Sequence, residues 1–380
     1  MRPLRVGLIA PPWVPVPPNI YGGTELVVDQ LARGLTAAGC EVTLFGTGEA
    51  TCPVPRRWLY PQSLGTMADP SAELAHVEAA YRELVGVDVI HDHTLSGPPW
   101  ADLHPPGTPV VTTVHGEFTP EMRELYTVAA AAGVAVVAIS ESQRCTALEV
   151  PVAAVIHHGI DLVRYPVGRG DGGYVMFLGR MHPDKGVHRA IEVARAAGKR
   201  ILLAAKMWEP AEHRYFAERV EPLLGPDAVY LGEVGGWRKL ELLGGAEALI
   251  NPIRWPEPFG LVMIEALACG TPVLAFPEGA APEVVDDTHT GFLCVDEGDM
   301  AAKTALVSDL DRRACRASAE RRFSSGRMAE DHLELYRRLL DERPDGQPAA
   351  LVTPLPAEVP GRIDGGRVTG SSSDSWVRSV

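Results

Sequence analysis

The start of this chain alternates between apolar and amphipathic segments, and this alternation is the strongest constraint on its fold. Residues 5–10 form an apolar run that stops at a pair of prolines, as expected of a buried strand. Residues 25–38 carry apolar side chains at helical spacing, and we expect Thr24 to cap that helix. A second apolar run follows at 41–45. A strand, a helix and a strand in this order predict a βαβ unit, and such units build parallel sheets.

The alternation continues over most of the chain in two series. The first series predicts further strands at 87–91, 109–115, 135–139 and 154–156, and helices at 72–84, 121–131 and 143–148. The second series predicts strands at 174–178, 201–205, 229–231, 248–251, 273–275 and 291–294, and helices at 187–197, 209–224, 238–243, 261–268 and 299–306. We therefore predict an α/β protein with two doubly wound, Rossmann-like domains. Because open α/β sheets bind ligands at the carboxyl ends of their strands, we expect the two sheets to face each other across a cleft.

Breaks in this pattern set the expected domain boundaries. A glycine-rich loop interrupts the alternation, and we place the two domains at 1–163 and 164–320. A length of 380 residues suits two or three domains. Residues 321–341 contain a last amphipathic helix. The segment 342–380 is rich in proline, glycine and serine, and its lack of periodicity predicts a disordered tail.

The composition disfavours several classes of protein. A formal net charge of -14 makes the chain a poor binder of nucleic acid or anionic membranes. No segment approaches the roughly 18 apolar residues of a membrane span, so we expect no integral membrane segment. The prolines after the first apolar run argue against a signal peptide. The six cysteines lack the Cys-x-x-Cys spacing of zinc and redox sites, which predicts reduced thiols in a cytoplasmic protein.

The most specific motif places two glutamates around an expected helix start. Glu257 precedes the helix at 261–268, and Glu265 lies about one turn inside it. The free N–H groups at a helix N-terminus suit a phosphate, and carboxylates suit the hydroxyl groups of a sugar or ribose. Here those N–H groups belong to Phe259, Gly260 and Leu261. Two glutamates at this spacing are by themselves usually surface residues beside a core helix, but the whole string over 257–273 is far more specific.

A second motif places two cations after the first strand of the second series. Arg180 is expected at the carboxyl end of that strand, and Lys185 at the entrance of the next helix. Two fixed cations there would neutralise the charge that grows on a diphosphate leaving group. A Gly-Arg pair alone is usually an ordinary basic turn.

Two weaker signals lie in the first series. Gly22 and Gly23 follow the first strand, where glycines can cradle a phosphate or let a sugar approach, with Glu25 as a further candidate contact. On spacing alone, a simple strand-to-helix turn is equally common. His115 ends a strand that would face the cleft, although a buried core histidine is the default interpretation. The string His91-Asp92-His93 lacks a third ligand at recognisable spacing, so we predict a structural cluster or a sugar-contacting loop rather than a metal site.

Together these motifs resemble the family 4 retaining glycosyltransferases, which have the GT-B fold. The likeness extends to about residue 340 and rests on Gly22-Gly23-Thr24-Glu25, His115-Gly116, the pair Arg180 and Lys185, and the Glu257/Glu265 motif. It implies a nucleoside-diphosphate sugar donor held mostly by the second domain and an acceptor held by the first. It also implies hexosyl transfer with retention of the anomeric configuration, no obligatory metal or other cofactor, and a last helix, at 330–340, that crosses back to the first domain.

The resemblance also implies individual roles. Arg180 and Lys185 would bind the diphosphate, Glu265 the ribose, and Glu257 would lie against the donor sugar, which His115 would contact from across the cleft. Lys206 departs from the family pattern, which commonly has glycine there. This lysine could touch the diphosphate, select an acidic acceptor or extend into solvent.

We therefore expect a glycosyltransferase that uses a hydroxyl group of a glycan or a secondary metabolite as acceptor. The alternatives are a sugar-nucleotide epimerase on a similar fold and a non-catalytic sugar-nucleotide-binding protein. The presence of all four charged motif residues argues against a silent binding protein.

Overall fold

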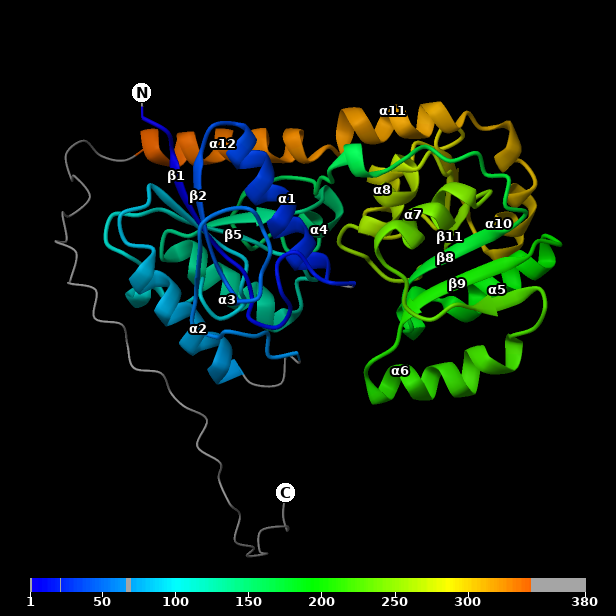
Figure 1. Cartoon of the computed structure of the whole chain (residues 1–380), viewed down its shortest axis with the longest axis horizontal. Helices are drawn as coiled ribbons and strands as arrows, with labels where there is room; N and C mark the ends of the chain where they lie inside the picture. Colours follow the sequence, from blue (N-terminus) through cyan, green and yellow to red (C-terminus); the bar gives the residue numbers. More distant parts are fainter. Residues whose placement is uncertain (1, 21, 66–69, 343–380) are drawn as a thin grey trace, which may run out of the picture.

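The computed structural model describes residues 2–20, 22–65 and 70–342, which form two α/β halves (Figure 1). Each half is built on its own parallel sheet. The tail predicted at 342–380 lies outside the described residues from 343 onward.

The first half contains a seven-stranded sheet in the order β3-β2-β1-β4-β5-β6-β7, with every strand pair parallel. Its strands are β1 (Arg5–Ile9), β2 (Glu41–Gly46), β3 (Arg56–Trp58), β4 (Val89–Asp92), β5 (Val110–Thr113), β6 (Ala135–Ala138) and β7 (Val152–Val155). Its helices are α1 (Gly23–Ala37), α2 (Pro70–Glu83), α3 (Pro120–Ala131) and α4 (Glu141–Cys145), with a 3-10 turn at Ala101–Leu103. The strand order reverses between β1 and β4, and such a switch point opens a crevice at the carboxyl ends of the strands.

The second half contains a six-stranded parallel sheet in the order β10-β9-β8-β11-β12-β13. Its strands are β8 (Val175–Arg180), β9 (Ile201–Lys206), β10 (Ala228–Tyr230), β11 (Leu249–Asn251), β12 (Val273–Ala275) and β13 (Gly291–Leu293). Its helices are α5 (Val187–Ala196), α6 (Pro210–Tyr215), α7 (Gly236–Gly245), α8 (Leu261–Ala268), α9 (Ala281–Val284), α10 (Glu297–Thr304) and α11 (Arg312–Arg322), with short turns at Leu162–Arg164, Pro183–Lys185 and Val307–Asp309. Here the switch point lies between β8 and β11.

Helices cover both faces of each sheet, which explains the apolar strands. In β1, Leu8 packs in the core beneath α1, while Ile9 packs in the core beneath α2. A strand that is buried on both faces needs apolar side chains at successive positions, and this is the pattern seen at 5–10. The predicted fold class, two doubly wound α/β domains, is therefore confirmed.

The last helix, α12 (Ser325–Asp341), crosses back onto the first half. It lies beside α1 in Figure 1, and Met328, Leu333 and Tyr336 belong to the core of the first half. It begins earlier than the expected residue 330 because the Ser324 hydroxyl accepts a hydrogen bond from the Arg327 N–H and caps the helix. The connection between the two sheets runs from β7 to β8, and the boundary predicted at 163–164 lies within it.

Several element boundaries differ from the sequence-based expectation. Helix α1 begins at Gly23 with Gly22 as its N-cap, so Thr24 is not the cap. The helix expected over 209–224 changes after α6 into a π-helical turn, Phe216–Val220, and a 3-10 turn, Glu221–Leu223, where Pro222 has no N–H to continue the α-helical pattern. Strand β3 and helix α9 are too short for periodicity to show. Helix α11 was not expected because its sequence is mostly polar and charged.

Candidate active site

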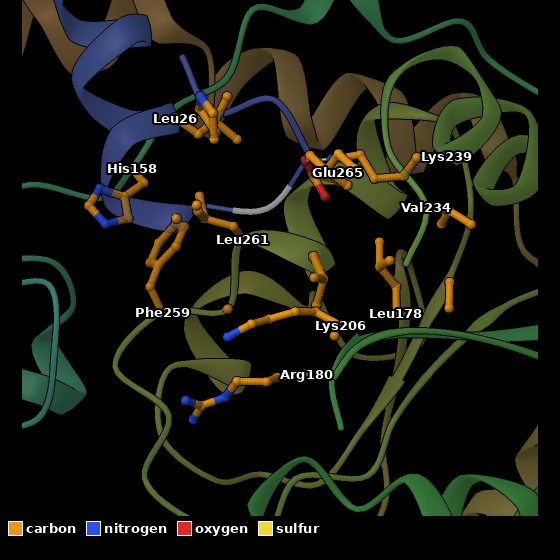
Figure 2. A pocket seen from close by; sticks show the side chains of 18 of the residues that line it. Leu26, His158, Leu178, Arg180, Lys206, Val234, Lys239, Phe259, Leu261 and Glu265 are labelled. Carbon is orange, nitrogen blue, oxygen red and sulfur yellow. Dashed lines mark hydrogen bonds and ion pairs between the residues drawn. The ribbon is translucent and has the colours of Figure 1, made fainter. Parts of the chain in front are cut away.

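A cavity of about 510 Å³ lies between the two halves, at the carboxyl ends of both sheets. Figure 2 shows side chains from both halves around it, including Leu26 and His158 from the first half and Arg180 and Glu265 from the second. The predicted site residues that line this cavity are Gly22, Gly23, His115, Arg180, Lys185, Lys206, Glu257, Phe259, Gly260, Leu261 and Glu265.

Glu25 is the one candidate that does not line the cavity. Its side chain is buried below the glycine loop, and a Cβ on Gly22 would come within 2.8 Å of its carboxylate. Burial raises the pKa of Glu25 to about 7 because the charged form loses water. The structure therefore gives Glu25 a place beneath the loop and shows why a side chain at Gly22 would not fit.

Glu257 forms an ion pair with Lys185 inside the cavity. The side chains are 16% and 14% exposed, so both charges are largely shielded from water. The Lys185 ammonium also lies 5.2 Å from the centre of the Trp255 ring, which favours a cation there. The pair joins the loop before α8 to the turn before α5 and places a cation directly beside a carboxylate.

The backbone around Glu257 depends on two glycines. Gly260 has φ of 86° and is the N-cap of α8, a conformation that side chains disfavour. Gly279 has φ of 55°, and a Cβ there would lie 2.3 Å from the Glu257 carbonyl oxygen. Because the atoms in the way belong to the backbone, any side chain at Gly279 would force the backbone of Glu257 to shift. The sequence pattern indicated only the N–H group of Gly260, and the structure adds the requirement for its backbone conformation.

Glu265 is held by two donors that the sequence analysis did not identify. Its Oε1 accepts hydrogen bonds from the Tyr165 hydroxyl at 3.0 Å and from Lys239 Nζ at 2.5 Å. Figure 2 shows Lys239 reaching Glu265 from α7. Lys239 lies in the first turns of the helix after β10, at the same sheet edge as Arg180. This position in the sequence could have identified it as a site residue. Nothing local connects Tyr165 to Glu265, since they are 100 residues apart.

Arg180 and Lys206 end neighbouring strands and lie at the same register in the sheet. Both side chains extend into the cavity in Figure 2. The buried carboxylate of Glu212 lies 3.7 Å from Arg180 Nε and 4.0 Å from Lys206 Nζ. Lys206 also lies over the Trp208 ring at 4.3 Å, and its side chain is only 9% exposed. The expectation that Lys206 could extend into solvent is therefore wrong, because these contacts hold it inside.

His115 is half-buried and belongs to a row of imidazoles whose other members are buried. Its Nε2 lies 2.9 Å from Nδ1 of His93, and its ring stacks against His158 at 5.3 Å. Burial lowers the pKa of His115 to about 3, with a smaller contribution from His332, so the ring is neutral near pH 7. Among the described residues, no group of three or more His, Cys, Asp or Glu side chains could hold a metal ion. Asp92 instead accepts hydrogen bonds from Tyr81 and from the Thr94 N–H.

Two family models match successive parts of the chain. The model described as Glycosyltransferase Family 4 matches residues 21–164, and the model described as Glycosyl transferases group 1 matches residues 167–321. Their order agrees with the two halves of the fold and with the motifs that line the cavity. This chain is a family 4 glycosyltransferase.

Similar proteins support the same assignment over most of the length of this chain. The α-maltose-1-phosphate synthase of Mycolicibacterium smegmatis is 28% identical, over 85% of this chain and 97% of that protein. The crystal structure of AviGT4, a glycosyltransferase involved in avilamycin A biosynthesis, is 29% identical with a TM-score of 0.68, over 90% of this chain and 99% of that one. The sucrose-phosphate synthase structure from Thermosynechococcus elongatus has a TM-score of 0.73 at 21% identity, over 89% and 99% of the two chains, and shows the same GT-B fold.

These matches support transfer of a glycosyl group and give no support to an epimerase or a silent binding protein. In the part of the glycosyltransferase that the structure describes, no helix is long and apolar enough to cross a bilayer.

Proposed function

We propose that this glycosyltransferase moves a hexosyl group from a nucleoside-diphosphate sugar to a hydroxyl group of an uncharged acceptor, with retention of the anomeric configuration. The observation that carries the proposal is the ion pair between Lys185 and Glu257 beside Arg180. In this proposal Lys185 serves the leaving phosphate, and the carboxylate of Glu257 beside it serves the sugar.

In this proposal the diphosphate binds at the carboxyl ends of β8 and β9. Arg180 and Lys185 contact it, and Lys206 supplies a third cation at the same edge. As the bond between the anomeric carbon and the phosphate oxygen breaks, negative charge grows on the phosphate and positive charge on the sugar ring. Fixed cations stabilise the negative charge on the phosphate, and the Glu257 carboxylate stabilises the positive charge on the sugar ring. Because three side-chain cations serve the diphosphate, we propose that no metal is obligatory.

Glu265 is proposed to bind the ribose. Its Oε1 is occupied by Tyr165 and Lys239, and both contacts fix the direction of the carboxylate. No hydrogen bond to its Oε2 is present among the described residues, and Glu265 lines the cavity. A carboxylate oxygen held in one direction is suited to accept hydrogen bonds from a diol.

The acceptor is proposed to be uncharged because the described residues on the side of the cavity formed by the first half offer no cation to bind a negative charge. The described cavity residues between 17 and 158 include no lysine or arginine, and the pKa values of both histidines there are lowered. The described cations of the cavity all come from residue 164 onward. A glycan or a small secondary metabolite fits such a surface, whereas a phosphorylated acceptor would lack a partner on it.

Free thiols support a place for this reaction in the cytoplasm. Five of the six cysteines are buried, and all six are free. Such thiols fit a reducing compartment.

The test is a panel of nucleoside-diphosphate sugars followed by product analysis. A donor at 100 times its dissociation constant stabilises the fold by about 2.7 kcal/mol, which a thermal-shift assay resolves. The best donor is then incubated with neutral and phosphorylated acceptors, with and without a chelator. We expect a product with the anomeric configuration of the donor, a neutral acceptor and unchanged rates with chelator. An inverted product, or activity that a chelator abolishes and a metal restores, would contradict the mechanism.

A further inference from the structure

A continuous row of imidazoles connects the crossing helix α12 to the cavity. His332 on α12 lies 5.2 Å from His91, His91 stacks on His93 at 4.1 Å, and His93 lies 5.2 Å from His115. His115 then stacks on His158 at the cavity wall. In this row, only the contact between His93 and His115 joins two ring nitrogens by a hydrogen bond, as far as the described residues show.

That hydrogen bond has a direction that the surroundings determine. Burial holds the pKa values of His93 and His115 below their usual range. Both rings are therefore neutral, and each carries a single N–H. Either His93 Nδ1–H donates to His115 Nε2, or His115 Nε2–H donates to His93 Nδ1. The second arrangement would put the remaining proton of His93 on Nε2.

Nε2 of His93 is buried and has no hydrogen-bond partner among the described residues. A buried N–H without an acceptor is rarer and more costly than a bare acceptor nitrogen. The first arrangement is therefore favoured. It leaves the proton of His115 on Nδ1, which is the ring nitrogen that remains for a ligand in the cavity.

We propose that His93 is a positioning residue that holds His115 as its Nδ1–H tautomer, so that His115 offers a hydrogen-bond donor to the sugar in the cavity. This proposal rests on the proposed function, which makes the cavity ligand a donor sugar. His115 would then bind a sugar hydroxyl oxygen through a neutral N–H, and it could not serve as a base through that nitrogen.

The rest of the row keeps His93 in place. His91 is bonded at Nε2 to the Thr113 hydroxyl, 2.8 Å away, and at Nδ1 to the Tyr336 hydroxyl, 2.7 Å away. Since Tyr336 belongs to α12, the crossing helix fixes the ring against which His93 stacks. A flat, anchored neighbour restricts rotation of His93 and keeps its Nδ1 directed at His115.

The direct test is nuclear magnetic resonance of the ¹⁵N-labelled full chain without substrates. Two-bond ¹H–¹⁵N correlations distinguish the two neutral histidine tautomers, and His115→Gln assigns the signal. We expect the Nδ1–H pattern for His115. An Nε2–H pattern would overturn the proposal, and because no substrate is present, it would leave the proposed function untouched.

A pair of variants tests the role in turnover. In His93→Asn the amide nitrogen takes the place of Nδ1 and can still donate to His115, whereas His93→Leu has a similar shape and no donor. We expect kcat/KM with the best donor to fall about tenfold in His93→Leu, the effect of one hydrogen bond, and to stay near the wild-type value in His93→Asn. Equal losses in both variants, or no loss in His93→Leu, would overturn the proposal.

His76 provides the matched control. It is also buried and neutral in the first half, and its Nε2 bonds to the Ala10 carbonyl oxygen rather than to a cavity residue. His76→Leu and His76→Asn should lower the melting temperature to a similar degree as the His93 variants and leave the His115 tautomer signal unchanged. If His76→Leu shifts that signal as His93→Leu does, the effect is one of packing and the proposal fails.

Discussion

Glu257 and Glu265 have different surroundings, and the difference predicts different effects of their removal. Glu257 pairs with one cation, Lys185, while Glu265 is fixed by a tyrosine and a lysine. Glu265→Gln should raise the donor KM about tenfold with little change in kcat, since the loss of a uniform binding contact acts on KM. Glu257→Gln should lower kcat by about 100-fold, since an amide cannot stabilise positive charge on the sugar ring.

Steady-state kinetics on both variants, with donor affinity from calorimetry, measures this difference. A KM effect alone at Glu257, or equal losses of kcat in both variants, would mean that the two carboxylates lie at opposite ends of the donor from those proposed.

Lys185 is the cation that pairs with Glu257, the proposed contact of the donor sugar. Lys185→Met keeps a long apolar stem but removes the charge, and we expect kcat/KM to fall by about 100-fold, because a charged group aimed at a leaving group has an effect of that order. Lys199→Met is the matched control. Lys199 pairs with Glu247 at 2.6 Å and does not line the cavity, so its loss should leave kcat/KM unchanged. An equal effect of the two substitutions would show that general charge, rather than place, is responsible.

At the scale of elements, the contact between α1 and α12 is close enough to require a glycine. A Cβ on Gly34 of α1 would lie 2.7 Å from the Ala329 Cβ and 2.9 Å from the Ser325 carbonyl oxygen. Neither atom can move without moving α12. Gly34→Ala should therefore lower the free energy of unfolding by about 1–3 kcal/mol, the typical effect of overpacking.

Gly326 provides the control, because a Cβ there meets nothing within 4 Å. Gly326→Ala should raise the free energy of unfolding by about 0.5–1 kcal/mol through helix propensity. Urea unfolding of both variants measures whether each substitution raises or lowers the free energy of unfolding. If Gly34→Ala also stabilises the protein, α12 docks less closely than described.

At the scale of the whole molecule, buried neutral histidines predict acid sensitivity. Burial lowers the pKa of His76, His91, His93, His115, His158 and His332, to about 3 at His115 and about 4 at His76 and His332. In the unfolded chain a histidine titrates near about 6.5. Below that pH the unfolded state binds more protons, so stability present above about pH 6.5 is lost as the pH falls.

Each such histidine contributes up to about 1.4 kcal/mol per pH unit within this window. Asp92 and Glu25 act in the opposite direction, because their pKa values are raised to about 6 and about 7, but two groups offset six only in part. Urea unfolding at about pH 7.5 and about pH 5.5 should show a large loss at the lower pH, above the range in which exposed carboxylates titrate. Equal stability at both values would mean that the row of imidazoles is hydrated or charged in solution.

Much of the fold and of the site followed from local sequence patterns. Apolar runs buried on both faces, helical spacing and glycine punctuation identify strands and helices, and their alternation alone produces parallel sheets. Because ligands bind at the carboxyl ends of such strands, position along the chain was enough to bring Arg180, Lys185, Glu257 and Glu265 to one cavity.

Only the tertiary structure determined the partners of those residues. The pairing of Tyr165 with Glu265, the placement of Lys206 beside Glu212 and the contact between the ring nitrogens of His93 and His115 depend on how loops from different strands meet. Glu25 has a motif position like that of a ligand-binding residue, yet its side chain turns beneath the loop. Spacing along the chain determines which residues reach the edge of a sheet. The direction of each side chain there is set by packing against segments far away in the sequence, and no local pattern encodes it.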